Sequence, residues 1–183
     1  MIHRGNHARP ARGGKIVSAI FHDADDAEQA YRKTIELGYT DDEITVLMSQ
    51  QARDRYFPSE RVEVEHGNKA LKGTGVGGAV GATVGVIAGV IAAVGTVVAI
   101  PPPGLVVAGP LAAALAGAGA GSITGGLIGA LVGAGITEDR AMVYKTAIEK
   151  GGVVLTIAPH SEADAEVIAK EWDDCGGDEV YRA

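Results

Sequence analysis

The 183-residue sequence contains one cysteine, few aromatic residues and, in its middle third, no charged residue at all. A single cysteine excludes an intramolecular disulfide scaffold, and no Cys/His spacing resembles a zinc site. Aromatic residues make up 4% of the chain, which is too few for the base-stacking platforms of single-strand binders. With a net charge of −7, the chain lacks the basic face that phosphate neutralisation requires. We therefore expect no nucleic-acid partner, no metal and no cofactor.

The missing charges define a central block, residues 73–137, in which 65 consecutive residues include no Asp, Glu, Lys, Arg or His. The block also holds 18 of the 27 glycines, so it must be built differently from its acidic flanks. Residues 1–14 form a basic tail whose composition is typical of disorder. Residues 15–72 form a first half with a connector, and residues 138–183 form a helix and a second half.

The first half reads as strand, helix, strand. KIVSAIFH (15–22) and EITVLMS (43–49) are rich in β-branched residues and predict strands. Between them, apolar residues recur at helical spacing from Ala24 to Leu37, with Asp23 placed as the N-cap and Gly38 as the stop signal. Acids of the first turn, Glu28 among them, suit the helix dipole. Two strands joined through a helix form a βαβ unit with parallel strands.

Residues 151–182 repeat this pattern. GVVLTIAP predicts a strand, Ser161 is the N-cap candidate of a helix that ends before Gly176 and Gly177, and DEVYR predicts a closing strand. Two such halves would complete one four-stranded sheet backed by two helices. The fold class expected is therefore α+β, a ferredoxin-like split βαβ domain interrupted by the central block.

The glycines of the central block recur every four residues. They form two rows, to which we assign helix packing: Gly73, Gly77, Gly81, Gly85, Gly89 and Gly117, Gly121, Gly125, Gly129, Gly133. In a helix such a row leaves a groove of bare backbone that favours close helix–helix approach. Between the rows, Pro101, Pro102, Pro103 and Gly104 mark the turn. We expect a glycine-zipper helical hairpin with arms at about 76–99 and 106–135.

Either arm has the roughly 20 residues that a transmembrane helix needs, and in water the block would expose a large uncharged surface. We therefore expect a membrane-spanning hairpin, the alternatives being the core of a water-soluble oligomer or a β-rich self-assembling segment. Lys69 and Lys72 precede the hairpin, and Arg140 and Lys145 follow it. By the positive-inside rule, both termini would lie in the cytoplasm.

The runs KALKGTGVGGAVGATVG, PPPGLVVAGPLAAALAGAGAGS and GGLIGALVGAGITEDRAMVYKTAIEKGGVVLTIAP resemble the bacterial general-stress-protein family with a glycine-rich central hairpin. The opening IVSAIFHDADDAEQAYRKTIELGY is similar to the N-terminal half of that family. The resemblance implies stress-associated expression, a membrane location and no established enzymatic activity. It supplies no catalytic residue.

Signals for enzyme chemistry are weak. Gly73 to Gly78 satisfies G-x-G-x-x-G, but no acidic residue follows before Glu138, and the four-residue spacing accounts for the same glycines. His22 with Asp23, and His160, follow strands at equivalent places in the two halves, where cap or loop roles explain them. Cys175 lies among acids that disfavour a thiolate. Glu63, Glu65 and His66 alternate as on a solvated strand face rather than a metal site.

We therefore predict a non-enzymatic, stress-associated protein of the cell membrane that forms homo-oligomers through the hairpin and carries a cytoplasmic acidic domain. Its partners would be other copies of itself and the lipid bilayer. The alternative is a cytoplasmic, self-assembling structural protein, a filament or shell with the hairpins as its core. A third possibility is a binding module in which the sheet surface takes a small ligand or a protein.

Overall fold

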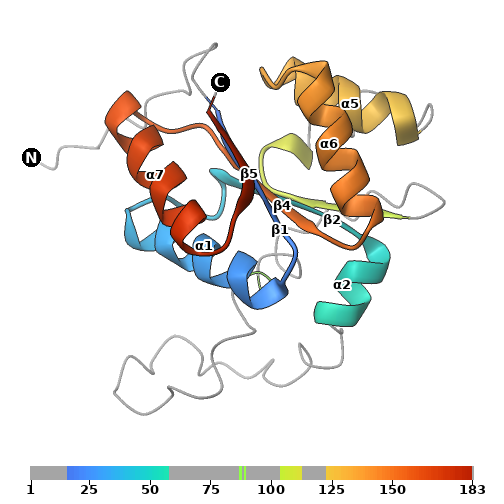
Figure 1. Ribbon diagram of the computed structural model, residues 1–183, viewed down its shortest axis with the longest axis horizontal. Coiled ribbons are helices and arrows are strands. Elements are labelled where there is room, and N and C mark those ends of the chain that lie inside the picture. Colours follow the sequence, from blue (N-terminus) through green and yellow to red (C-terminus); the bar gives the residue numbers. More distant parts are fainter. Residues whose placement is uncertain (1–15, 58–86, 88, 90–103, 113–122, 183) are drawn as a thin grey trace, which may run out of the picture.

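The computed structural model describes residues 16–57, 87, 89, 104–112 and 123–182. These residues form an α+β structure around one antiparallel sheet of five strands, in the order β3-β2-β4-β1-β5 (Figure 1). The α+β class predicted from the sequence is confirmed. The sheet has one strand more than the four that were predicted.

The first half folds as its local signals predict, into β1 (Val17–Phe21), α1 (Ala24–Glu36) and β2 (Ile44–Ser49). The Asp23 carboxylate accepts the N–H of Asp25 at 2.8 Å and so caps α1. Gly38 ends the helix with φ +97°, a left-handed conformation that glycine adopts at little cost. The predicted boundaries of this half are therefore close to those observed.

The second half contains β4 (Val153–Ile157), α7 (Glu162–Asp174) and β5 (Asp178–Arg182). Ser161 caps α7 by accepting the N–H of Asp164 at 3.1 Å, as predicted. Gly176 adopts φ +83° directly after the helix. The same strand–helix–strand unit thus occurs twice in the chain.

The two halves are interleaved in the sheet. β4 pairs antiparallel with β1 and with β2, so β1 and β2 run parallel to each other but are separated by β4. Likewise β1 lies between β4 and β5. Each half therefore supplies a strand that completes the ladder of the other half, and one half alone would leave unpaired strand edges.

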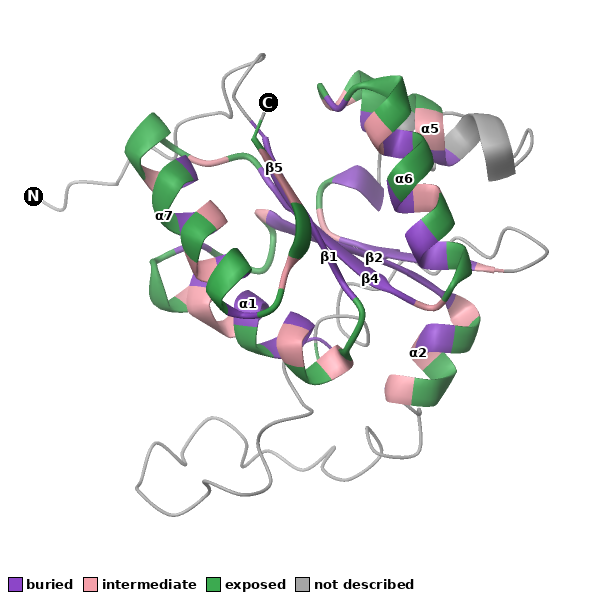
Figure 2. Cartoon of the chain, in the orientation of Figure 1, coloured by how far each residue is buried: buried purple, intermediate pink, exposed green. Residues whose placement is uncertain are grey.

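Helices cover both faces of the sheet (Figures 1 and 2). α1 and α7 lie on one face over a core that we call the first core. α5 (Ile123–Gly133) and α6 (Glu138–Glu149) lie on the opposite face over a second core. Because both faces are covered, alternate residues of the inner strands enter different cores, and β1, β2 and β4 are buried along their whole length.

A contact between α1 and α7 relates the two halves directly. The indole N–H of Trp172 donates to Thr34 Oγ1 at 2.9 Å, and both residues are fully buried. They are 138 residues apart, the same separation as between Asp23 and Ser161. The residues in contact are thus equivalent positions of the two repeats.

The central block contributes a strand that the sequence did not predict. β3 (Leu105–Ala108) pairs antiparallel with β2, directly after α2 (Gln50–Tyr56) in the order of the described elements. It overlaps the end of the predicted turn and the start of the stretch, about 106–135, that was predicted to be the second helical arm. Adjacent β-branched Val106 and Val107 favour a strand, and Gly109 with φ +98° ends it. A Cβ at Gly109 would lie 2.2 Å from the carbonyl oxygen of Ile44, so only glycine allows this close approach.

The prediction of a transmembrane helix is wrong for the part of the chain that the structure describes. None of its helices is both long enough and apolar enough to cross a membrane. α5 has 11 residues, against the roughly 20 that a span requires. The first residues of the predicted second arm pair with β2 instead, and its residues 113–122 lie outside the described residues.

Candidate functional site

A polar cluster joins the loop before β2 to the loop before α7. His160 Nε2 lies 2.6 Å from Glu43 Oε1, and the imidazole ring stacks on the Tyr39 ring with centroids 4.5 Å apart. The Tyr39 hydroxyl accepts the backbone N–H of His160 at 3.0 Å and donates to Asp164 Oδ2 at 3.2 Å. Four side chains from the two halves are therefore tied together at one end of the sheet.

The surroundings of this cluster shift two of its titratable groups. Burial is the main cause that raises the pKa of Tyr39, which keeps its hydroxyl protonated and able to donate to Asp164. Burial also acts to raise the pKa of Glu43, but hydrogen bonds from the Thr40 N–H, from His160 and from the Thr40 hydroxyl outweigh it. The pKa of Glu43 is therefore lowered, and its carboxylate is an ionised acceptor.

A second histidine–carboxylate pair also joins the two halves. His22 Nε2 is 3.3 Å from Asp178 Oδ2, and both side chains are mostly exposed. Asp23, which the sequence paired with His22, instead caps α1. His22 and His160 each follow the first strand of one half and bond to a carboxylate at the start of the second strand of the other half. Such pairs can exchange a proton, but in this arrangement each pair forms a contact between one half of the domain and the other.

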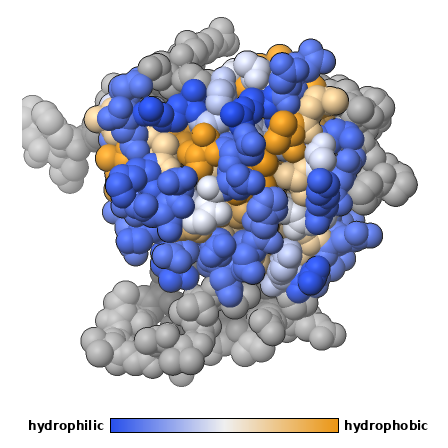
Figure 3. All heavy atoms as spheres, viewed as in Figure 1, coloured by the Kyte–Doolittle hydropathy of each residue, from blue (hydrophilic) through white to orange (hydrophobic). Residues whose placement is uncertain are grey.

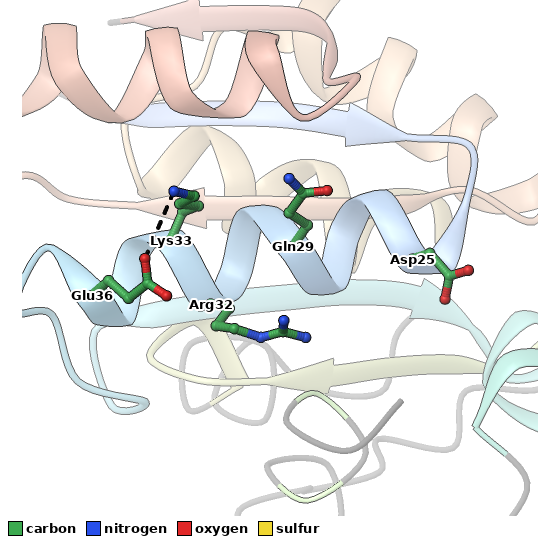
Figure 4. Close-up of a pocket in the computed structure, with 5 residues that line it drawn as sticks. All are labelled: Asp25, Gln29, Arg32, Lys33 and Glu36. Carbon is green, nitrogen blue, oxygen red and sulfur yellow. Dashed lines mark ion pairs between the residues drawn. The ribbon is translucent and has the colours of Figure 1, made fainter. Parts of the chain in front are cut away.

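A shallow hollow of about 410 Å³ lies along the outer face of α1 (Figure 4). Its described lining comes from this helix alone, with the Lys33 ammonium 3.8 Å from the Glu36 carboxylate. The other lining residues are Asp25, Gln29 and Arg32. Charges of both signs at helical spacing are typical of a solvated helix face. The surrounding face is largely hydrophilic, with apolar groups in separate spots (Figure 3). The hollow therefore does not define a ligand class.

Cys175 is buried at the end of α7. Burial, followed by the nearby Glu171 carboxylate, raises the pKa of its thiol. Because the thiolate is the nucleophilic form, the structure disfavours this cysteine as a nucleophile. Within the described ranges, no group of three or more His, Cys, Asp or Glu side chains could hold a metal ion.

Four of the ten row glycines lie in the described part of the chain. Gly129 and Gly133 lie on α5, and a Cβ built at either would meet no described atom within 4 Å outside its own helix backbone. The same holds for Gly89. Gly125 lies in the first turns of α5. The other six row glycines and Pro101, Pro102 and Pro103 lie outside the described residues. Gly104, the last turn residue, accepts the N–H of Gln50 through its carbonyl oxygen.

Sequence reasoning missed a buried carboxylate. Glu28 on α1 is 1% exposed, and its Oε2 accepts the backbone N–H of Ile87 at 3.1 Å. The sequence assigned Glu28 to the first turn, as an acid that suits the helix dipole, and did not predict that it is buried; the acids of the first turn are Asp25 and Asp26. The spacing of Glu28 from Tyr31 and Ile35 on the apolar face of the helix was the signal that it points inward.

Comparisons with known proteins give no relative. A scan against protein-family models, a search of curated proteins and a search of solved structures each found no match. The resemblance to the general-stress-protein family therefore stays a prediction. Residues 73–78, with the G-x-G-x-x-G pattern, and Glu63, Glu65 and His66 lie outside the described residues.

Proposed function

We propose that this protein is a non-enzymatic, self-associating protein in which the glycine row of α5 packs against a second copy of the chain. α5 presents two rows at four-residue spacing. Leu127 and Leu131 are buried in the second core, whereas Gly129 and Gly133 are exposed. Residues two positions apart lie about 200° apart around a helix. The leucines therefore hold α5 on the domain while the glycines face outward.

The exposed glycines carry the proposal. In a helix, each glycine costs about 1 kcal/mol relative to alanine, and a Cβ at Gly129 or Gly133 would clash with nothing in the described structure. The described residues of one chain therefore give no reason for glycine at these positions. Close approach of a helix from another molecule does, because a bare backbone ridge allows it. Val132, 44% exposed between them, adds apolar surface to the same region.

We also propose a ferredoxin-like arrangement with β3 added at one edge. The order β2-β4-β1-β5, with two interleaved strand–helix–strand halves, supports this assignment. The stress association that the family resemblance implies belongs to the proposal as well. The domain would then act as a scaffold that presents α5, rather than as a site for chemistry.

The test compares Gly129→Leu with Val167→Leu, a matched substitution at an exposed position on α7. Mass is measured over a dilution series by sedimentation velocity. We expect Gly129→Leu to shift the protein towards the monomer, although leucine raises helix propensity, and Val167→Leu to behave like the unchanged chain. Equal association of all three proteins, or a monomer at every concentration, would refute packing through this row.

A further inference from the structure

A row of hydroxyl side chains crosses the sheet on the face that α6 covers. Thr45 on β2 lies opposite Thr156 on β4, and Thr156 lies opposite Ser18 on β1. All three residues are buried. Their neighbours two positions away on the same strands belong to the second core: Ile20, Leu47 and Val154. Because residues two apart share a face of a strand, the three hydroxyls also face the second core.

The hydroxyls of this row differ in their hydrogen bonds. Ser18 Oγ lies 2.6 Å from the Tyr144 hydroxyl of α6. Thr45 Oγ1 accepts the backbone N–H of Leu111 at 3.4 Å, a long bond that does not use the hydroxyl proton of Thr45. Thr156 Oγ1 forms no hydrogen bond with any described residue, although Thr156 is only 4% exposed. Thr156 is therefore the residue of the row that needs a partner.

A threonine at position 156 is not explained by strand formation or by packing. Valine has nearly the same shape without the polar atom and favours strands as well, and β4 has valine at two other positions, Val153 and Val154. Burial of a hydroxyl without a hydrogen bond opposes folding, because the bonds to solvent are lost and not replaced. Buried polar groups that lack a protein partner commonly bind ordered water.

We propose that Thr156 and Thr45 hold one buried water molecule between them, which bridges β4 and β2. Side chains directly opposite each other on antiparallel strands have Cβ atoms about 4.5–5.5 Å apart, a spacing at which one water reaches both hydroxyls. Each hydroxyl can donate one hydrogen bond and accept two, so both have capacity for the water. Ser18 is not assigned to the site, because its hydroxyl is already bonded to Tyr144.

This water joins the two halves of the domain inside the second core, since Thr45 belongs to the first half and Thr156 to the second. It extends the hydrogen bonding between β2 and β4 from the backbone ladder to the side chains. The site does not depend on association through α5, so it is tested separately from the proposed function.

Magnetic relaxation dispersion of the water ¹⁷O nucleus counts the water molecules that stay in the protein for longer than it tumbles. We expect this number to fall by one in Thr156→Val and in Thr45→Val, and to stay unchanged in Thr156→Ser, which keeps the hydroxyl. Thr34→Val is the matched control. The Thr34 hydroxyl is also buried, but its hydrogen bonds are to the Ala30 carbonyl and the Trp172 indole. This variant should therefore keep every long-lived water.

Urea unfolding followed by circular dichroism gives a second measure. Because Thr156→Val loses a bonded hydroxyl, we expect its equilibrium constant of unfolding to rise by about three- to tenfold. A decrease or no change would overturn the site, since the hydroxyl would then have been buried without a partner.

The water count separates the remaining outcomes. An unchanged count in Thr156→Val would overturn the site even if this variant were less stable. A loss in Thr156→Val that Thr45→Val does not share would overturn the bridge between the two strands. An equal loss in Thr34→Val would show that any destabilised core releases the water, and the assignment to Thr156 would be wrong.

Discussion

Truncation of Leu131 tests whether α5 belongs to the folded domain or projects from it as the arm of a separate hairpin. Leu131 is fully buried in the second core, and its neighbour Val132 is 44% exposed. Leu131→Ala removes buried methyl groups and leaves a cavity, so we expect a loss of about 2–5 kcal/mol in the free energy of unfolding. Val132→Ala, at an exposed position of the same helix, should change it by less than about 0.5 kcal/mol.

Trp172 is the only tryptophan and is fully buried in the first core. Its fluorescence therefore reports unfolding on the face of the sheet opposite Leu131. In urea, Leu131→Ala should lower the midpoint of this transition with little change in slope. For a chain of this size, the expected fall in Tm is about 4–20 °C, since each kcal/mol shifts Tm by about 2–4 °C.

An α5 that does not pack on the sheet would give a different result. In a hairpin that folds independently of the sheet, Leu131 would have no connection to Trp172. The Trp172 transition would then have the same midpoint in Leu131→Ala, Val132→Ala and the unchanged chain. That result would refute the second core and, with it, the fixed orientation of α5 on which the proposed function depends.

Two further predictions follow from the shifted pKa values. Because the pKa of Glu43 is lowered on folding, its ionisation stabilises the fold above the unfolded pKa, and this contribution is lost as the pH falls below about 4.5. Between pH 7 and pH 3, the urea midpoint should therefore fall less in Glu43→Gln than in the unchanged chain. An equal fall of the midpoint in both proteins would contradict this. Because burial raises the pKa of the Cys175 thiol, iodoacetamide at pH 8 should modify the folded chain much more slowly than the urea-unfolded chain; similar rates would show that the thiol is accessible.

The elements of both halves could be predicted because their signals are local. A helix cap needs one acceptor at the right place, and Asp23 and Ser161 supply it within three residues of the N–H groups they bond. Gly38 and Gly176 end their helices through their own backbone conformation. None of these features depends on the rest of the fold, which is why the sequence alone predicted them.

β3 could not be found in the same way, although its own residues favour a strand. LVVA lies in a run dominated by glycine and alanine at four-residue spacing, and that periodicity outweighed the two adjacent valines. What decides the structure is the register with β2, in which Val107 lies opposite Leu47. This pairing joins residues far apart in the chain.

The polar contacts between the two halves also have a local part that could be predicted and a long-range part that could not. The sequence placed His22 and His160 at equivalent positions, and that equivalence holds in the structure. Their partners, Asp178 and Glu43, were not predicted because they come from the opposite half. The pairing follows from the strand order, since β5 lies next to β1 and β2 next to β4.

The uncharged block thus serves the fold and the proposed association through different residues of one helix, α5. Leu127 and Leu131 fix α5 on α6 and the sheet, and this fixes the direction in which Gly129 and Gly133 face. A surface held rigidly before association loses less conformational entropy on binding than a flexible arm would. Two copies that meet through the same surface are related by a two-fold axis. Association through α5 would therefore orient the two domains relative to each other, which a freely jointed hairpin could not do.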